Sequence, residues 1–245
     1  MNAKEQGLKA PTNCVMNAAL GRSSTIVQAT LVIEKGMNLN RGLQSSMDTR
    51  NLFVVTGGPG CGKTTVLLEL EKLGYSYAPE VARQIIQEQV RSGGRALPWD
   101  DRELYTKLML EQSIESYKRH ASSSQVTFAD RGIPDTLGYA RLIGLEDLSA
   151  IQSACSDYRY ARRVFFAPAW KEIYATDQER KQDFAEAQRT CDQILEVYQE
   201  CGYEIVELPR TAPEARAEFI LEQISELISE MRSQLESCRV PGENG

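Results

Sequence analysis

A glycine-rich loop between a short apolar run and a helical pattern most constrains this sequence. Residues 57–64 read G-G-P-G-C-G-K-T, which fits G-x-x-x-x-G-K-T, and they follow the apolar run Leu52–Val55. Glycine permits backbone conformations and close approaches that a side chain would block, so N–H groups can converge on a phosphate. Val66, Leu67 and Leu70 then fall on one face of a helix. Strand, loop and helix stand in the order that a phosphate cradle requires, which predicts binding of a nucleoside triphosphate.

The residues of this phosphate loop have expected roles. Lys63 is expected to reach the β- and γ-phosphates, and Thr64 is expected to offer its hydroxyl to Mg²⁺. The cofactor cradle as a whole is expected to contain Gly57, Gly58, Pro59, Gly60, Cys61, Gly62, Lys63, Thr64 and Thr65. Because the backbone does the binding, the side chain of Cys61 is expected to be incidental. ATP and Mg²⁺ are the expected cofactors, and no N-K-x-D motif, which reads guanine, accompanies the loop.

Composition and charge narrow the class of protein. The 245 residues are 42% hydrophobic and 25% charged, which suits one globular α/β domain with some excess length. The net charge of -6 argues against a surface that coats nucleic acid, so no nucleic-acid partner is expected. The apolar runs are of strand length, so no membrane span is expected. The six scattered cysteines form no C-x-x-C pair, and no secretory signal is visible, which indicates reduced thiols and a cytoplasmic location.

From residue 51 onward, apolar runs alternate with helical patterns, which predicts a parallel sheet with crossover helices. The predicted strands are Leu52–Thr56, Tyr75–Ala78, Val126–Ala129, Arg163–Ala167 and Tyr203–Leu208. The predicted helices run from the phosphate loop to Leu73, around Val81–Ile86, from an N-cap at Asp100, from about Gln178 to Glu200, and from Pro213 onward.

The domain boundaries are predicted from changes in composition. Residues 51–232 form the nucleotide-binding domain, and residues 233–245 form a tail. Residues 1–50 read as a poorly ordered extension, because Asn, Ser, Gly and Gln surround a single apolar stretch, Thr25–Ile33. That stretch is expected to be one strand or one helix packed on the domain.

Glu80 and Arg83 follow the second predicted strand, at the carboxyl edge where open α/β sheets bind ligands. A carboxylate at this place could accept the proton of an attacking hydroxyl, and Arg83 lies one helical turn further on the same face. Glu80, Arg83 and Arg131 are therefore the candidates for binding a phosphate acceptor. The alternative is a helix-start Glu that favours the helix dipole and pairs with Arg83.

Asp130 and Arg131 end the apolar run Val126–Ala129 at the same edge. An Asp there can hold a Mg²⁺-bound water that faces the phosphates, and Arg131 can neutralise a transferring phosphoryl group. Thr64 and Asp130 are thus the candidate metal ligands. The alternative is a strand-end turn, since Asp and Gly favour turns.

Two further arginines are candidates around the nucleotide. Arg180 stands in a charged stretch after the fourth predicted strand, where a lid could clamp the phosphates, although a solvated helical face explains the same residues. Arg210 follows the fifth predicted strand and is expected near the adenine.

Together these residues resemble the P-loop small-molecule kinases. Pro79–Arg83 looks like the P-E-(P)-V-A-R segment of deoxynucleoside kinases, whose Glu is the catalytic base. Asp130–Gly132 looks like the E-R-S or D-R-[YS] segment of deoxynucleoside and thymidylate kinases, and Glu179-Arg180 looks like their lid arginine. The layout over about 51–230 is similar to the NadR-like AAA-type "predicted ATPase" family, related to the ribosylnicotinamide kinase domain. The resemblance implies the three-layer α/β P-loop NTPase fold with a five-stranded parallel sheet, nucleoside- or nucleotide-kinase-like.

The favoured hypothesis is a Mg²⁺-dependent phosphotransferase that moves phosphate from ATP to a small hydroxyl-bearing, nucleoside-like acceptor. Lys63, Glu80, Asp130, Arg131 and Arg180 are its candidate catalytic residues. Asp130 stands where deoxynucleoside kinases have Glu, which leaves its role open between metal holding and acceptor binding. The main alternative is a regulatory switch that binds and slowly hydrolyses ATP or GTP to control a partner. A third reading is a domain that keeps the fold without turnover.

Overall fold

The computed structural model describes residues 26–33, 51–123, 125–174 and 183–238. The chain divides into two compact units, one over 44–217 and the other over 1–43 together with 218–245. The larger unit contains the phosphate loop and is described first.

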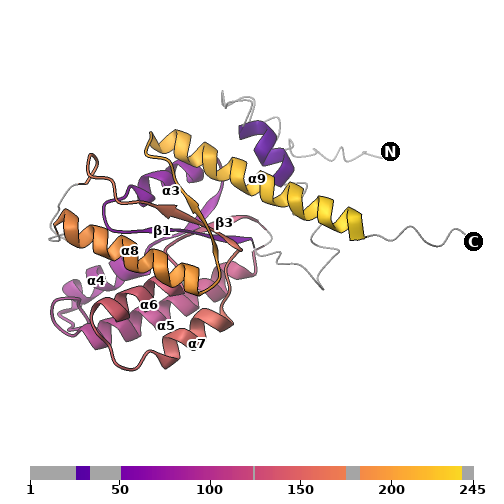
Figure 1. Cartoon of the computed structure of the whole chain (residues 1–245). Coiled ribbons are helices and arrows are strands. Elements are labelled where there is room, and N and C mark those ends of the chain that lie inside the picture. The colour runs from indigo at the N-terminus through magenta and orange to yellow at the C-terminus, as the bar shows by residue number, and fades with distance from the viewer. Residues whose placement is uncertain (1–25, 34–50, 124, 175–182, 239–245) are drawn as a thin grey trace, which may run out of the picture. The chain divides into compact units, whose positions relative to one another are not determined.

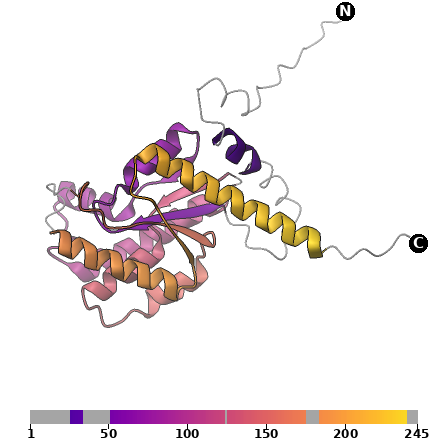
Figure 2. The same cartoon turned by 45° about the horizontal axis from the view of Figure 1, so that its top comes forward.

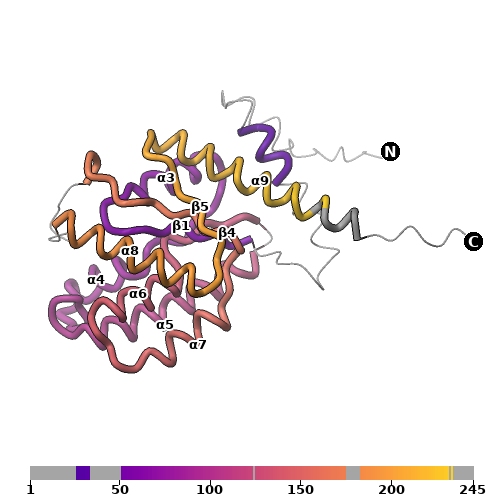
Figure 3. Tube along the Cα trace, viewed as in Figure 1, coloured from indigo at the N-terminus to yellow at the C-terminus, as the bar shows by residue number. Residues whose placement is uncertain are grey.

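Five parallel strands form the centre of the larger unit (Figure 1). The strands are β1 (Leu52–Gly57), β2 (Ser76–Ala78), β3 (Thr127–Asp130), β4 (Arg163–Ala167) and β5 (Glu204–Glu207). Their order is β2-β3-β1-β4-β5, so β1 is the middle strand, with β4 and β5 on one side of it (Figure 3). The predicted five-stranded parallel sheet is confirmed. Each predicted strand is present within one or two residues of its expected bounds.

Helices cover both faces of this sheet. Helix α3 (Lys63–Lys72) packs on β1, β2 and β3. Helices α6 (Ile133–Leu142) and α8 (Phe184–Glu200) pack against each other on the opposite face (Figures 1 and 2). Helix α5 (Arg102–Ala121) packs between α6 and α4 (Val81–Ser92), and α7 (Ser149–Asp157) packs on α6. The arrangement is the predicted three-layer α/β fold.

The core of the larger unit lies along the three central strands, in which every residue is buried. The ring of Phe53 on β1 stands 6.2 Å from those of Phe128 on β3 and Phe165 on β4. A strand covered on both faces reads as a continuous apolar run rather than as an alternation. For this reason the central strands could be predicted from the sequence. The sheet that they form holds the loops at its carboxyl edge.

Several predicted helix ends are wrong by a few residues. The N-cap of α5 is Asp101, whose side chain accepts from the N–H of Leu104, rather than Asp100. Helix α8 begins at Phe184, where Asp183 and Glu186 form a capping box, rather than near Gln178. The prediction did not single out α6 or α7.

The smaller unit contains a helix over 26–33 and the part of α9 (Pro213–Cys238) from residue 218 onward. The two helices lie side by side (Figures 1 and 2), and Ile33, Ile220 and Ile224 are buried. The apolar stretch expected to be a strand or a helix is therefore a helix. Helix α9 continues past residue 232, where the sequence analysis placed the end of the domain. Across the described residues, none of the helices combines the length and apolarity needed to cross a bilayer.

Substitution of Gly57 tests how closely the phosphate loop packs on the sheet. Its φ is +132°, and a Cβ atom there would overlap the carbonyl oxygen of Ala167 on β4. Strain and overlap together predict that Gly57→Ala lowers the free energy of unfolding by about 3 kcal/mol, measured by urea denaturation. Gly74→Ala is the matched control, because Gly74 also has a positive φ, +93°, but an added Cβ meets nothing within 4 Å. That control is expected to cost only about 1 kcal/mol, and equal losses in the two variants would refute the packing argument.

Candidate functional site

The phosphate loop lies beyond the carboxyl end of β1, at a crevice in the sheet. From β1 the chain runs to β2 at one edge of the sheet, and from β4 it runs to β5 at the other edge. Ligands of open α/β sheets bind at such switch points. Gly60 and Gly62 both have φ +74°, a conformation that L-residues rarely adopt, so the loop needs glycine at these two positions.

Lys63 is buried inside the loop that it follows. Its Nζ donates to the carbonyl oxygens of Gly57 at 3.2 Å and Gly58 at 2.7 Å. Burial lowers the pKa of Lys63, and the nearby Arg131 lowers it further. The side chain thus already stands at the centre of the cradle, where its ammonium group can exchange carbonyl partners for phosphate oxygens.

Thr64 and Asp130, the two candidate metal ligands, lie within hydrogen-bonding distance of each other. The register pairs Val55 with Asp130, which brings the end of β3 beside β1. Thr64 Oγ1 donates to Asp130 Oδ2 at 3.3 Å, whereas Asp130 Oδ1 is buried and has no hydrogen-bond partner among the described residues. Burial raises the pKa of Asp130. The Thr64 hydroxyl and the Asp130 carboxylate, one oxygen of which accepts no hydrogen bond among the described residues, are oxygen ligands that suit Mg²⁺.

No cluster of three or more His, Cys, Asp or Glu side chains that could hold a metal occurs in the described ranges. Mg²⁺ beside a nucleotide binds through one or two protein oxygens plus phosphates and water. Thr64 and Asp130 therefore fit a metal that arrives with its nucleotide.

Arg131 has the most constrained conformation in the site. Among the described residues it is the only non-glycine with a positive φ, at +74°. Its Nε donates to Glu80 Oε1 at 2.8 Å, and its Nη1 donates to Gly57 O at 2.8 Å and to Asp135 Oδ1 at 2.9 Å. A strained backbone that persists at a ligand crevice is typical of a residue whose side chain must be held in one place.

Asp135 is a site residue that the sequence analysis did not identify. Besides Arg131, its carboxylate accepts from Thr56 Oγ1 at 2.6 Å, Tyr198 OH at 2.7 Å and Gly132 N at 2.9 Å. The residue stands in the first turn of α6, three positions after the N-cap Gly132, a spacing at which a carboxylate accepts the N–H of the N-cap residue. That spacing was the available signal. Asp135 fixes Arg131 rather than facing a ligand.

The carboxylate of Glu80 is ionised and forms ion pairs with two arginines. Besides the bond to Arg131, its Oε2 lies 3.9 Å from Arg83 Nε. Burial raises the pKa of Glu80, but the positive charges of Arg131 and Lys63 and the hydrogen bond from Arg131 outweigh burial and hold it at about 2. The structure thus brings Glu80, Arg83 and Arg131 together, and their binding of an acceptor stays a prediction.

A single cleft of about 1100 Å³ joins these groups. It is lined at one end by residues 59–65 of the phosphate loop and elsewhere by Glu80, Arg83 and Arg131. Several lining residues were not among the predicted site residues; the larger ones are Trp99, Arg102, Tyr105, Trp170 and Arg216. A cavity of this size accommodates more than one small ligand.

Two predicted arginines are not placed at the cleft. Arg180 lies outside the described residues. Arg210 is exposed and its Nη2 donates to Ala169 O at 3.4 Å, while the neighbouring Thr211 and Arg216 line the cleft. The nucleotide contact of Arg210 stays a prediction.

Comparison with known proteins gives a family and a fold. The model of the AAA domain family matches residues 52–216. A search of curated proteins found no match. Among solved structures, the NadR protein in complex with NR is 19% identical with a TM-score of 0.58, over 73% of this chain and 51% of its own. The chain thus spans about half the length of that NadR protein.

Two kinases give weaker structural matches. The shikimate kinase from Acinetobacter baumannii in complex with shikimate is 18% identical with a TM-score of 0.46, over 72% of this chain and 93% of its own. The thymidylate kinase from Ehrlichia chaffeensis is 17% identical with a TM-score of 0.49, over 71% of this chain and 97% of its own. Both TM-scores lie below 0.5, so these two matches support no conclusion, and the match to the NadR protein at 19% identity bears on the fold alone.

The ion pair of Glu80 predicts a pH dependence of stability. Its folded pKa of about 2 lies below the ordinary 4.5, so its stabilising effect is complete above pH 4.5 and is lost as pH falls toward 2. The difference in unfolding free energy between wild type and Glu80→Gln is expected to shrink by about 3 kcal/mol between pH 6 and pH 2, measured by urea denaturation. Glu88→Gln, at an exposed position on the same helix, is the control. A difference that stays constant with pH would contradict the ion pair.

Proposed function

Since the chain belongs to the AAA domain family, whose model covers residues 52–216, we propose that it transfers phosphate from ATP to a small acceptor. The acceptor is a hydroxyl-bearing, nucleoside-like metabolite, and the reaction depends on Mg²⁺. One observation carries this proposal. The phosphate loop and the Glu80–Arg131 pair line the same cleft, so a donor and an acceptor can meet there.

The donor half of the cleft is the phosphate loop with Lys63. The backbone N–H groups of Gly60, Cys61 and Gly62 and the N-terminus of α3 favour the negative charge of the phosphates. Lys63 exchanges its bonds to Gly57 and Gly58 for bonds to the β- and γ-phosphates. Glycine at 60 and 62 keeps this part of the loop free of side-chain obstruction.

Thr64 and Asp130 would hold Mg²⁺, which neutralises charge on the phosphates when bound. The unpartnered Oδ1 of Asp130 and its 3.3 Å contact with Thr64 Oγ1 support this assignment. Asp130 itself is held at the end of β3 by the sheet, so it keeps its oxygens at a fixed distance from the loop.

The acceptor half contains Glu80, Arg83 and Arg131. With its pKa held at about 2, Glu80 is a weak proton acceptor, but it can orient an acceptor hydroxyl by accepting its hydrogen bond. Phosphoryl transfer through a loose transition state depends more on positioning and charge than on proton removal. Arg131 stands between Glu80 and the loop carbonyl of Gly57, where it can stabilise charge on the moving phosphoryl group, and Arg180 would add to this from the lid.

The nucleoside-like character of the acceptor is supported by the residues and by the comparison. Two aromatic residues, Trp99 and Tyr105, line the cleft together with Arg83. The matching NadR structure holds NR, and Pro79–Arg83 resembles the corresponding segment of deoxynucleoside kinases.

A nucleotide switch is the second candidate. Two observations favour the switch: the low pKa of Glu80 and its 2.8 Å bond to Arg131. Both fit a Glu80 carboxylate that holds Arg131 in place and activates no acceptor. In that case the chain hydrolyses its nucleotide slowly and phosphorylates no small molecule.

Isotope transfer separates the two functions. With γ-labelled ATP, Mg²⁺ and a panel of nucleosides, label is expected in at least one phosphorylated acceptor. Glu80→Gln is expected to lower the transfer rate by about 100-fold because the hydroxyl is no longer oriented, with nucleotide affinity retained. Release of inorganic phosphate alone with every acceptor would reject the phosphotransferase and favour the switch.

The metal ligand is tested separately. Asp130→Asn keeps the side-chain volume but removes the charge, and it is expected to reduce Mg²⁺-dependent turnover by about 100-fold or more. Turnover is measured against Mg²⁺ concentration, and removal of Mg²⁺ by a chelator should abolish it in the wild type. Asp157→Asn, at an exposed position on α7, is the control. Equal Mg²⁺ dependence in Asp130→Asn and wild type would remove Asp130 from the metal site.

A further inference from the structure

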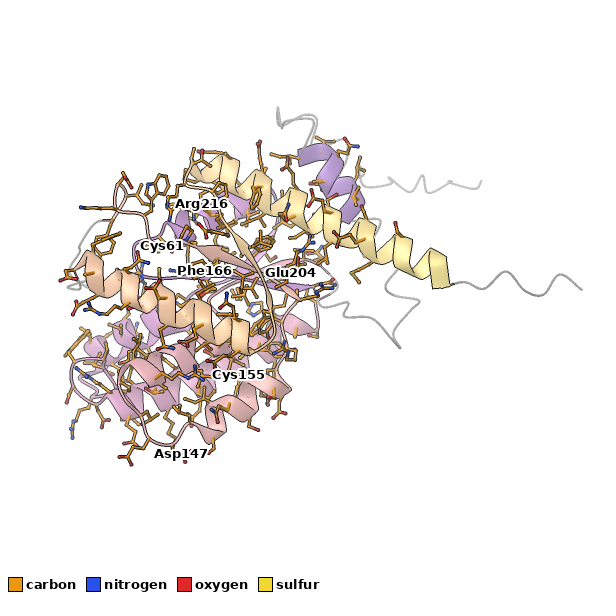
Figure 4. The ribbon with its side chains drawn as sticks, in the orientation of Figure 1. Cys61, Asp147, Cys155, Phe166, Glu204 and Arg216 are labelled. Carbon is orange, nitrogen blue, oxygen red and sulfur yellow. The ribbon has the colours of Figure 1, made fainter. Side chains whose placement is uncertain are left out.

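Two buried thiols meet where α8 packs on the phosphate loop. Cys61 in the loop and Cys191 on α8 are 2% and 1% exposed, and their sulfur atoms lie 3.7 Å apart. Figure 4 shows Cys61 beside α8, with Arg216 near it. The expectation that the Cys61 side chain is incidental does not account for this contact.

The thiol of Cys191 is also bonded to the loop backbone. The N–H of Gly58 donates to Cys191 Sγ at 3.0 Å. A Cβ added to Gly58 would lie 2.5 Å from the same sulfur, so α8 and the loop are in direct contact. Any movement of Cys191 Sγ is therefore transmitted to an N–H group that belongs to the phosphate cradle.

Cys61 is the more reactive of the two sulfurs. Its hydrogen bond with Cys191 and the charges of Lys63, Arg131 and Arg216 lower its pKa to about 6, although burial opposes this. Cys61 also lines the cleft, which gives a small oxidant a route to it. Thiolate character and access are the two properties that select a cysteine for oxidation.

We infer that Cys61 and Cys191 form a reversible redox site that controls the shape of the phosphate loop. The oxidant is a peroxide. In the first step the Cys61 thiolate attacks a peroxide oxygen, which breaks the O–O bond and gives Cys61 sulfenic acid and one water from hydrogen peroxide. In the second step the Cys191 thiol attacks that sulfur and releases a second water, leaving a disulfide. Two thiols thus lose two electrons to one peroxide, and a dithiol reverses the reaction by exchange.

The bond would distort the cradle. Sulfur atoms at 3.7 Å must approach by about 1.6 Å to reach disulfide length. Because Cys61 belongs to a tight glycine loop and Cys191 to the middle of a packed helix, the loop is the part that moves. The N–H groups of Gly60, Cys61 and Gly62 then no longer converge on a phosphate, which lowers nucleotide affinity. This consequence rests on the proposed nucleotide binding, whereas formation of the bond does not.

The chain contains a matched control pair. Cys155 on α7 and Cys201 after α8 are a second pair of neighbouring cysteines, in which Cys201 raises the pKa of Cys155, and Cys155 is buried like Cys191. In Figure 4, Cys155 lies near one end of α8 and Cys61 lies near the other end. Oxidation of this second pair has no direct route to the phosphate loop.

The experiment treats the reduced full chain with hydrogen peroxide and maps disulfides by proteolysis without reductant and mass spectrometry. Affinity for a fluorescent ATP analogue is measured before oxidation, after it, and after dithiothreitol. A peptide linked through Cys61 and Cys191 is expected, with affinity lowered about tenfold or more and restored by dithiothreitol. Cys191→Ser should remove this response, and Cys155→Ser should keep it. Thermal melting verifies that each variant is folded.

Three results would overturn the inference. They are oxidation without a Cys61–Cys191 link, a link with unchanged nucleotide affinity, and loss of the response in Cys155→Ser. If the reduced protein binds no nucleotide, the proposed function fails. The redox site is then still decided by the mapped link and by hydrogen exchange of residues 58–62, which should differ between the oxidised and reduced protein. Identical exchange would count against it.

Discussion

The ion pairs of Arg131 hold the candidate site together. Its backbone N–H bonds to Val55 O at 3.1 Å, and its guanidinium bonds to Glu80, Asp135 and the carbonyl of Gly57. The residue thus ties β1, β3, α4 and α6 at one point. A left-handed backbone costs about 1–2 kcal/mol, and burying a guanidinium costs several more. Two carboxylates and a carbonyl offset this cost.

The charge of the cleft differs from that of the chain. The whole sequence has a net charge of -6, yet the cleft is lined by Lys63, Arg83, Arg102, Arg131 and Arg216 against Glu80 and Glu186. A concave site lined by one sign of charge concentrates ligands of the opposite sign. The acidic remainder repels polyanions in general, so this charge pattern favours small anions at the cleft.

The sheet and the phosphate loop could be predicted from sequence because their signals are local. Continuous apolar runs mark the buried strands, and the glycine pattern marks the loop within a few residues. Helix ends were harder where two candidate caps adjoin, as Asp100 and Asp101 do. Helix α6 was missed because Pro134 and Gly138 are typical of loops, although proline is tolerated in the first turn of a helix.

Contacts between distant residues could not be predicted in this way. Asp135 meets Tyr198 across 63 positions of sequence, and Gly58 meets Cys191 across 133. Neither pair follows a helical or strand period, since the first arises where α8 packs on α6 and the second where α8 packs on the phosphate loop. Glu80 and Arg131 were each predicted from their place after a strand. Their direct bond, and the low pKa of Glu80 that follows from it, required the fold.

A crystal structure with Mg²⁺ and a non-hydrolysable ATP analogue tests the central claim most directly, which is that one cleft holds both donor and acceptor. The expected result is Lys63 moved from the carbonyls of Gly57 and Gly58 to the phosphates. The metal should lie on Thr64 and Asp130, and the γ-phosphate should face the open space beside Glu80 and Arg131. A γ-phosphate enclosed by the loop and separated from Glu80 would contradict the account.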